Sequence, residues 1–447
     1  MFSRILIATR GEIALRIIRA CKELGIETVV VYSEADRDSI YRRFADETIC
    51  IGPSSGAESY LNIPSIIAAA EIADVEAIHP GYGFLSEMSH FAEVCQSSNI
   101  GFVGPSPKAM ELMGDKSRAR KLAEDCGVPI VAGSDGKVET EEDAVQIAHE
   151  IGFPVMIKAS AGGGGRGMRV ARNDISLRHA FNVARAEAEA AFDDGTVYVE
   201  KLITEARHVE MQILGDHFGN IIALGERDCS LQRRHQKLIE ESPCPSITKE
   251  VREHLSKAAV GIATAAGYYG AGTVEFLVDK DQNFFFIEMN CRIQVEHPVT
   301  EMVTGIDIIK EQLRIASGHK LRIRQEDVEV RGVAIECRIN AEDPKNNFKP
   351  SPGKVATYFE PGGPGVRVDS HLYSGYVVPS AYDSLVAKLI VHRGNRREAV
   401  ACMKRALEEY VIEGIQTTIP LYLEIFGHSA FLSGKVDTNF IDTEFSD

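Results

Sequence analysis

Two acidic residues lie opposite each other on a predicted β-hairpin, in a pattern that suits a divalent cation. The segment 272–290 reads as two strands joined by a tight turn centred between Asp281 and Gln282, which places Glu275 directly across from Glu288. Two carboxylates at cross-strand distance repel one another. A hard cation such as Mg²⁺ or Mn²⁺ removes that cost, because it takes oxygen ligands. The hairpin therefore predicts a metal site.

The same alternation continues beyond the hairpin. The second strand is predicted to extend to Glu296. One of its faces would carry the polar residues Glu288, Asn290, Arg292, Gln294 and Glu296, and the other would be mostly apolar. A solvated edge strand also gives this pattern, but it seldom combines with an opposed pair of acids. We expect the shared polar face to bind a metal and an anion.

A run of glycines follows an apolar segment that ends at Lys158. Residues 162–165 are all glycine, so their backbone can approach a ligand closely and their N–H groups can surround an anion. The Walker A pattern is absent from the chain. A flexible linker is the alternative, but Arg166 adds positive charge and a strand is predicted to resume at 168–171. We expect a mobile lid over phosphate groups.

A cationic patch at 232–237, with the sequence Gln-Arg-Arg-His-Gln-Lys, stands out in an acidic chain. A solvated charge run balanced by Glu240 and Glu241 explains it as well as a ligand site does. Arg338 lies in an alternating segment, where a lone arginine is usually a surface or salt-bridge residue. Lys116 is equally uninformative by itself.

Alternating strands and helices precede these clusters. Strands are predicted at 4–8, 28–32, 77–79 and 101–103, with helices at 12–24, 63–73 and 90–96 between them. Such alternation predicts a parallel doubly wound sheet. From about Thr204 onward the pattern favours longer antiparallel strands.

Composition and charge argue against several classes of function. The chain has 447 residues, 44% of them hydrophobic, and a net charge of −16, which argues against non-specific binding of nucleic acid. Its nine cysteines form no C-x-x-C pair, as is typical of reduced thiols. No apolar run suits a signal peptide or a membrane helix. We expect a cytoplasmic protein that binds neither nucleic acid nor membrane.

Motifs in order along nearly the whole chain resemble the biotin carboxylase family of ATP-grasp enzymes. They lie at 10–14, 79–87, 104–105, 113–116, 158–165, 207–210, 226–230, 232–237, 288–290, 292–301, 336–342 and 382–384, with Lys388. The resemblance implies a multidomain α/β and α+β fold. Its parts would be an N-terminal domain with the parallel sheet (1–113), a helical connector (114–130), the ATP-grasp lid (131–203), the rest of the ATP-grasp unit (204–330) and a C-terminal domain (331–447).

The resemblance also implies a role for individual residues. ATP would be held by Lys116, Lys158, Gly164, Gly165, His208, Gln232 and His235, with Glu200, Lys201, Ile203 and Leu277 around the adenine. Glu275 and Glu288 would ligate Mg²⁺ or Mn²⁺, with a contribution from Asn290. Bicarbonate would be bound by Lys237, Arg292, Gln294 and Val295. Glu296 would be the general base, and Arg338 would stabilise the enolate form of biotin.

The implied reaction is that of a ligase: ATP and bicarbonate form carboxyphosphate, which carboxylates biotin. In acetyl-CoA carboxylase this step leads to malonyl-CoA for fatty acid synthesis; a subunit of a pyruvate or propionyl-CoA carboxylase is the alternative. The chain has no Met-Lys-Met sequence, so biotin would sit on a separate carrier protein, with separate carboxyltransferase subunits. The family commonly forms homodimers, for which Arg16 and Glu23 are suitably placed.

Three residues depart from the family pattern: Thr9, Ala161 and Cys291 stand where Asn, Gly and Thr or Ser are usual. Cys291 should point away from the site. Two rival functions are a ligase that makes carbamoyl phosphate and a non-catalytic nucleotide-binding subunit. The first expects a longer, duplicated chain, and the second expects loss of the acidic and basic residues that are present here.

Overall fold

The N-terminal part of the chain is built on a parallel sheet, as predicted. The computed structural model describes residues 1–134, 136–159, 168–192 and 194–445. The sheet has the order β3-β2-β1-β4-β5, and all its pairs are parallel. Its strands are β1 (Arg4–Ile7), β2 (Glu27–Tyr32), β3 (Glu47–Cys50), β4 (Ala77–His79) and β5 (Gly101–Phe102). The half-exposed strand β3 was not predicted.

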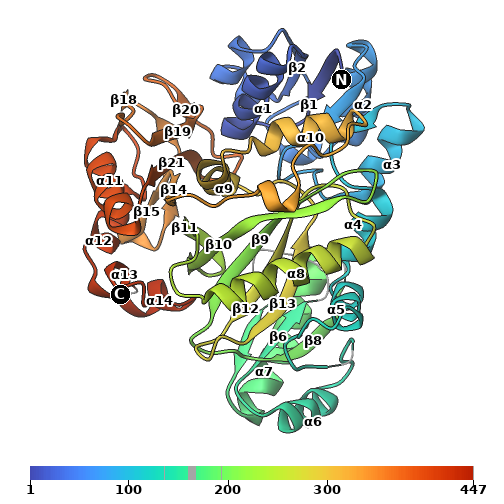
Figure 1. Cartoon of the computed structure of the whole chain (residues 1–447), viewed down its shortest axis with the longest axis vertical. Coiled ribbons are helices and arrows are strands. Elements are labelled where there is room, and N and C mark those ends of the chain that lie inside the picture. Colours follow the sequence, from blue (N-terminus) through green and yellow to red (C-terminus); the bar gives the residue numbers. More distant parts are fainter. Residues whose placement is uncertain (135, 160–167, 193, 446–447) are drawn as a thin grey trace.

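Helices cover both faces of this sheet. They are α1 (Gly11–Leu24), α2 (Ile63–Ile72) and α3 (Ser89–Ser97). Side chains of α1 pack with Ile5 and Ile7, whereas those of α2 and α3 pack with Leu6 and Val29. The alternation of side chains along each strand thus separates two apolar layers, which is the doubly wound arrangement. Figure 1 shows this part at the top of the molecule.

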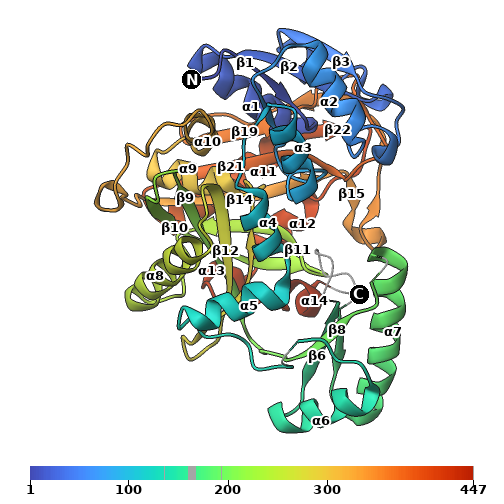
Figure 2. The same ribbon diagram turned by 90° about the vertical axis from the view of Figure 1, so that its right-hand side faces the viewer.

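A second, smaller unit lies at the opposite end of the molecule (Figures 1 and 2). Two helices lead towards it, α4 (Pro107–Gly114) and α5 (Lys116–Asp125). The unit contains α6 (Glu141–Ile151), α7 (Asp174–Phe192) and a sheet of order β7-β6-β8, formed by β6 (Val155–Ala159), β7 (Arg169–Ala171) and β8 (Val197–Lys201). The glycine run, with Ala161, Gly164, Gly165 and the predicted lid, lies outside the described residues.

One eight-stranded sheet forms the centre of the molecule and continues into the C-terminal part. Its order is β13-β12-β9-β10-β11-β14-β21-β19. The strands are β9 (Arg207–Gly215), β10 (Ile221–Arg233), β11 (Gln236–Ser242), β12 (Gly270–Val278), β13 (Phe284–Asn290), β14 (Val333–Asn340), β19 (Val366–Ser370) and β21 (Leu385–Arg393). Because β11 pairs with β14, the sheet runs across the predicted boundary between 330 and 331.

The two faces of this sheet differ in polarity. Helices α8 (Lys249–Ala265) and α11 (Arg396–Glu409) pack on apolar side chains; α9 (His297–Thr304) and α10 (Ile308–Ala316) lie on the face opposite them. Register places Glu210, Glu275 and Glu288 on one face, since each is paired with the next. The charged side chains are therefore gathered on the face that carries α9 and α10.

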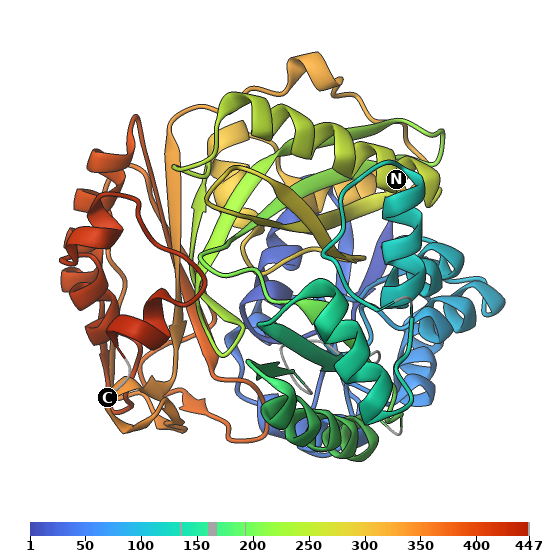
Figure 3. The same ribbon diagram turned by 90° about the horizontal axis from the view of Figure 1, so that it is seen from below.

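The C-terminal part completes the chain around the end of the sheet, where its helices stand on the outer side (Figure 3). Its remaining helices are α12 (Ile419–Ile425), α13 (Ser429–Leu432) and α14 (Phe440–Glu444). Its short strands are β15 (Glu342–Asp343), β16 (Lys349–Pro350), β17 (Gly353–Lys354), β18 (Thr357–Phe359), β20 (Val377–Val378) and β22 (Val411–Glu413).

Short 3-10 turns link several of the larger elements. They span Glu34–Asp36, Ile40–Arg43, Gly56–Glu58, Gln325–Asp327 and Pro344–Asn346. Across the part of the chain that the structure describes, no helix combines the length and the apolar character needed to cross a bilayer.

Candidate active site

The acidic hairpin has the predicted pairing. Strands β12 and β13 are antiparallel, and Glu275 pairs with Glu288. The turn is centred on Asp281, however, since Val278 pairs with Phe284, so the predicted turn centre is wrong by half a residue. A register shift between Glu275 and Phe276 brings the two acids opposite each other. Such an irregularity adds one residue to one strand and re-aims the side chains beside it.

The prediction that the second strand continues to Glu296 is wrong. Strand β13 ends at Asn290, residues 291–296 form an irregular loop, and α9 begins at His297. The N–H of Cys291 donates to Glu87 Oε1 over 3.0 Å, so a side chain takes the place of a strand partner. Cys291 itself packs into the apolar core, as expected for its side chain. The polar residues of the loop converge through side-chain contacts and not through strand alternation.

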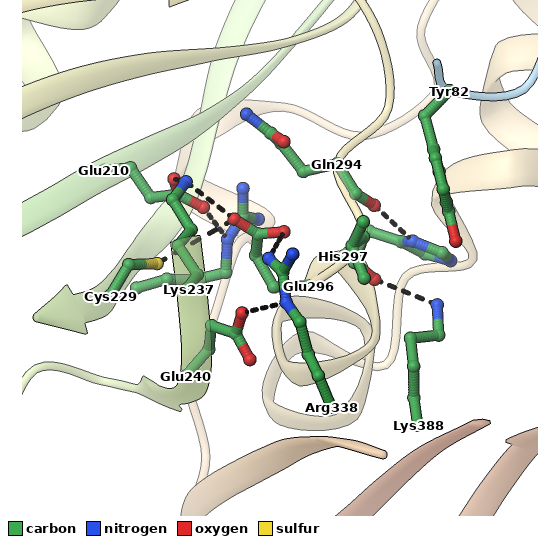
Figure 4. Close-up of polar contacts among 12 residues, drawn as sticks. Tyr82, Glu210, Cys229, Lys237, Glu240, Gln294, Glu296, His297, Arg338 and Lys388 are labelled. Atoms are coloured by element: carbon green, nitrogen blue, oxygen red, sulfur yellow. Dashed lines mark hydrogen bonds and ion pairs between the residues drawn. The ribbon is translucent and has the colours of Figure 1, made fainter. Parts of the chain in front are cut away.

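The centre of the site is a single ammonium group shared by acidic side chains. Lys237 Nζ lies 2.5 Å from Glu210 Oε2, 2.9 Å from Glu275 Oε1 and 2.8 Å from Glu296 Oε1. Figure 4 shows Lys237 between Glu210 and Glu296. All three carboxylates are buried. The cationic patch at 232–237 is therefore divided: Lys237 points into the site, whereas Arg234 is exposed at the turn.

Glu296 lies between two cations. Its Oε1 faces Lys237, and its Oε2 accepts a hydrogen bond from Arg338 Nη2 over 2.9 Å. Arg338 is held on its other side by Glu240, whose Oε1 lies 2.6 Å from Arg338 Nε. Burial alone would raise the pKa of Glu296, but the charges of Lys237 and Arg338 outweigh it and hold that pKa well below its usual range. Glu296 is therefore an ionised carboxylate that can accept a proton.

Arg292 is anchored by three neighbours. Its Nε donates to Glu87 Oε2 over 2.9 Å, its Nη1 to Gln294 Oε1 over 2.7 Å and its Nη2 to Asn290 Oδ1 over 3.3 Å. Gln294 Nε2 in turn donates to Glu275 Oε1 over 3.2 Å. These bonds fix a guanidinium group beside the hairpin acids, where it can bind a small anion.

The hairpin acids suit a divalent metal ion. Asn290 Nδ2 donates to Glu275 Oε1 over 2.9 Å, and His208 Nε2 lies 2.9 Å from Glu275 Oε2. For Glu288 the nearest cation is Lys116, 3.9 Å away. Burial, with the negative charge of Glu275, raises the pKa of Glu288. A carboxylate that is destabilised in this way gains from a cation beside it, so the donor set fits Mg²⁺ or Mn²⁺.

The residues expected around a nucleotide lie on the strands that lead towards this cluster. Lys158 Nζ on β6 is 2.5 Å from Glu200 Oε2 on β8, and Glu200 also pairs with Arg120. Lys201 Nζ donates instead to the carbonyls of Gly152 and Phe153, at 2.9 Å each. The Lys201 ammonium is thus engaged away from the acidic cluster.

Strand pairing and backbone conformation give the positions of the other residues that are expected to bind the nucleotide. Leu277 pairs with His208 across β12 and β9, and Gln232 pairs with Lys237 across β10 and β11. His235 lies at the turn between β10 and β11 with a positive φ of 64°. Ile203 is half-buried beyond β8.

Several residues of the site were missed from the sequence, although some of them lie within the quoted motifs. Glu210 could have been found from the same reasoning that paired the hairpin acids, because it pairs with Glu275 on the neighbouring strand. Cys229, whose Sγ lies 3.9 Å from Glu296 Oε1, gave no signal beyond its motif. Glu240 was considered only as a charge that balances the cationic patch. Glu87 lies in the motif at 79–87, far from Arg292 in sequence.

Comparisons with known proteins support the resemblance along the whole chain. Three family models match: the biotin carboxylase N-terminal domain at residues 1–110, the carbamoyl-phosphate synthase L chain ATP-binding domain at 115–324, and the biotin carboxylase C-terminal domain at 336–443. Biotin carboxylase 1 of Bacillus subtilis is 57% identical over 444 residues, which is 99% of each chain.

Solved structures agree. A biotin carboxylase complex with a β,γ-ATP compound from Campylobacter jejuni is 53% identical, with a TM-score of 0.97 over 99% of each chain. The biotin carboxylase domain dimer of Hydrogenobacter thermophilus 2-oxoglutarate carboxylase, bound to MgADP, ADP and bicarbonate, is 50% identical, with a TM-score of 0.96 over 99% of this chain and 98% of that one. The chain belongs to the biotin carboxylase family of ATP-grasp enzymes.

Proposed function

We propose that this chain uses ATP and bicarbonate to carboxylate biotin. The observation that carries the proposal is the position of Glu296 between Lys237 and Arg338, with contacts of 2.8 and 2.9 Å. A buried, ionised base lies there beside cations that can bind an anionic substrate. This is the arrangement that activation of bicarbonate requires.

Each side chain has a distinct task in the proposed reaction. Arg292, Lys237, Gln294 and the backbone of Val295 bind bicarbonate, and Glu296 removes its proton as the oxygen attacks the γ-phosphorus of ATP. The products are ADP and carboxyphosphate, which decomposes to carbon dioxide and phosphate beside biotin. The released phosphate takes the proton of the ureido nitrogen of biotin, and the resulting enolate attacks carbon dioxide. The guanidinium of Arg338 stabilises the negative charge of the enolate.

The pKa of Glu296 must rise for this step. Without substrate, Lys237 is shared by Glu210, Glu275 and Glu296. An anion that binds Lys237 draws part of its charge away from Glu296. The base then gains proton affinity at the moment when bicarbonate is in place, which moves its pKa towards the range that suits proton transfer.

The strands β6, β8 and β12 support binding of the nucleotide. Lys116 and Lys158 supply positive charge. Further contacts come from His208, Gln232, His235 and the predicted lid residues Gly164 and Gly165. Glu200, Lys201, Ile203 and Leu277 surround the adenine, Lys201 by its backbone. Glu275, Glu288 and Asn290 would hold Mg²⁺ or Mn²⁺, which neutralises phosphate charge when bound.

Purified protein is expected to hydrolyse ATP slowly with bicarbonate and faster when free biotin is added. Biotin accelerates turnover because it consumes the carbon dioxide that carboxyphosphate releases. A coupled assay that detects the release of ADP, run with and without biotin, measures the effect. Acceleration by ammonia in place of biotin would favour the carbamoyl-phosphate rival. The single match to an ATP-binding domain, at 115–324, and the match at 336–443 support the biotin reaction.

The partners and the compartment follow from this reaction. We place the biotin on a separate carrier protein and the second half-reaction on carboxyltransferase subunits, as in acetyl-CoA carboxylase and fatty acid synthesis. Carboxylation of pyruvate or propionyl-CoA is the alternative, and the biotinylated protein that co-purifies with the chain distinguishes them. All nine cysteines are free thiols, which supports a reducing, cytoplasmic location.

A homodimer is proposed through the surface of α1. A hollow of about 500 Å³ is lined there by Arg16, Arg19 and Glu23, among others. Arg16 is turned inward, with Nη2 2.8 Å from Glu301 Oε1 and 2.6 Å from Asp307 Oδ1. Arg19 and Glu23 are exposed, and Glu23 forms an ion pair with Lys310 of the same chain, so both residues are accessible to a partner. Sedimentation that shows only monomer at micromolar concentration would contradict the proposal.

A further inference from the structure

A lysine that has no role in the scheme above contacts the backbone of the loop that carries Glu296. Lys388 lies on β21 with 0% of its surface exposed. Its Nζ donates a hydrogen bond to the carbonyl of Val295 over 2.9 Å. Residues 291–296 form no strand ladder, so contacts from other elements orient this backbone. Lys388 binds the peptide group that joins Val295 directly to Glu296.

The same ammonium contacts a second element. Lys388 Nζ lies 3.2 Å from Glu12 Oε2, and Glu12 Oε1 accepts a hydrogen bond from the Tyr82 hydroxyl. Glu12 lies on α1 and Tyr82 follows β4, so both belong to the N-terminal part of the chain. Lys388 thus joins the N-terminal part, the C-terminal part and the loop of the site. Figure 4 shows Lys388 reaching towards this loop, with the hydroxyl end of Tyr82 above it on the same side.

Lys388 also shares a face with the other cation of the site. It pairs directly with Arg338 across β14 and β21, so both side chains project from the same face of the sheet. One of them contacts the carboxylate of Glu296, and the other contacts the carbonyl just before it. The backbone and the side chain of Glu296 are therefore both set by neighbouring residues of one strand pair.

Stability alone gives a weak reason for a charged group at this place. Removing a lysine and its carboxylate partner from water is costly, and uncharged residues of similar volume often replace such a buried pair with no loss of stability. The side chain of Glu12 is as deeply buried as that of Lys388, with 2% and 0% exposed. The pair is better explained by what it positions.

We propose that Lys388 is a positioning residue for the carboxylation of biotin. It orients the peptide between Val295 and Glu296 so that the carboxylate of Glu296 faces bicarbonate, and through Glu12 it ties that orientation to Tyr82. The inference rests on the proposed function, in which Glu296 is the base. A displacement of about 1 Å in such a group costs about 100-fold in rate.

The test is the double variant Lys388→Met with Glu12→Gln. Lys388→Met alone would leave the Glu12 carboxylate buried without its cation, which destabilises the fold. The double variant removes both charges and keeps an acceptor for the Tyr82 hydroxyl. We expect a thermal midpoint close to that of the parent protein and a KM for ATP within about threefold, with kcat for biotin-dependent turnover lowered about 100-fold.

A surface lysine provides the matched control. Lys404→Met changes an exposed lysine on α11 and should leave kcat unchanged. A folded double variant with kcat within about threefold of the parent would overturn the proposal. A double variant that does not fold would overturn it too, since Lys388 would then be structural. A parent protein that shows no response to biotin would overturn the proposed function and this inference with it, whereas an unaffected double variant of a responding parent would overturn the inference alone.

Discussion

Glu296→Gln is expected to lower biotin-dependent carboxylation by about 10²- to 10⁴-fold, the usual contribution of a general base. Glutamine keeps the shape of the side chain and can still accept a hydrogen bond from Arg338, now 2.9 Å from Glu296 Oε2, but it cannot take a proton. Lys158, which contacts Glu200 at the nucleotide end, is untouched. Steady-state kinetics should therefore show a loss in kcat with little change in the KM for ATP.

Glu241→Gln is the matched control for this prediction. Glu241 is also a buried carboxylate beside an arginine, 2.8 Å from Arg396 Nε, but it lies outside the cluster around Lys237. Its replacement should leave kcat close to that of the parent protein. If both variants lose the same activity, or if Glu296→Gln loses affinity for ATP, the role of Glu296 as the base is wrong.

The sequence predicted the pairing of the hairpin acids through an incomplete argument. Alternation and turn length placed Glu275 opposite Glu288, yet the observed turn is half a residue away and a register shift beside Phe276 restores the pair. An irregularity of this kind depends on packing against neighbouring strands, and no local pattern in the residues marks it.

Contacts between segments far apart in the sequence were the part of the site that was hardest to predict. Glu87 holds Arg292 across 205 residues of sequence, and Lys388 holds Val295 across 93. The periodicity of side chains predicts which face of a strand a residue occupies but not which strand becomes its neighbour. Polar residues that reach the site through the order of the strands, such as Glu210, therefore become visible only in the folded chain.

The loop after β13 shows a related limit of predicting structure from side-chain alternation. Every second residue from Glu288 to Glu296 does contribute to the site, as alternation suggested, but the backbone beyond Asn290 is irregular. Hydrogen bonds from Arg292 and Gln294 produce the convergence that a strand would have given. These side chains converge although the predicted strand is wrong, because their contacts with one another and with the hairpin acids do not require a continuous strand.

Glu288→Gln is expected to raise the Mg²⁺ concentration for half-maximal activity by at least about 10- to 100-fold, the loss that even outer partners of a metal cause. Glu288 is the cleaner of the two acids to change, because Glu275 also contacts Lys237 and His208. Titration of activity with Mg²⁺ at saturating ATP and bicarbonate measures the shift. Asp279→Asn, at the tip of the same hairpin, makes the same chemical change outside the site and should leave the titration unaltered.

The thermal stability of the protein without metal tests the same prediction independently. Glu275 and Glu288 are paired across the hairpin, so removing one charge relieves their repulsion. Glu288→Gln should therefore keep or raise the thermal midpoint without metal, and it should reduce the stabilisation that Mg²⁺ and nucleotide add, since a ligand stabilises only as far as it binds the folded state. A variant that is less stable without metal and responds normally to Mg²⁺ would show that Glu288 supports the fold and holds no cation.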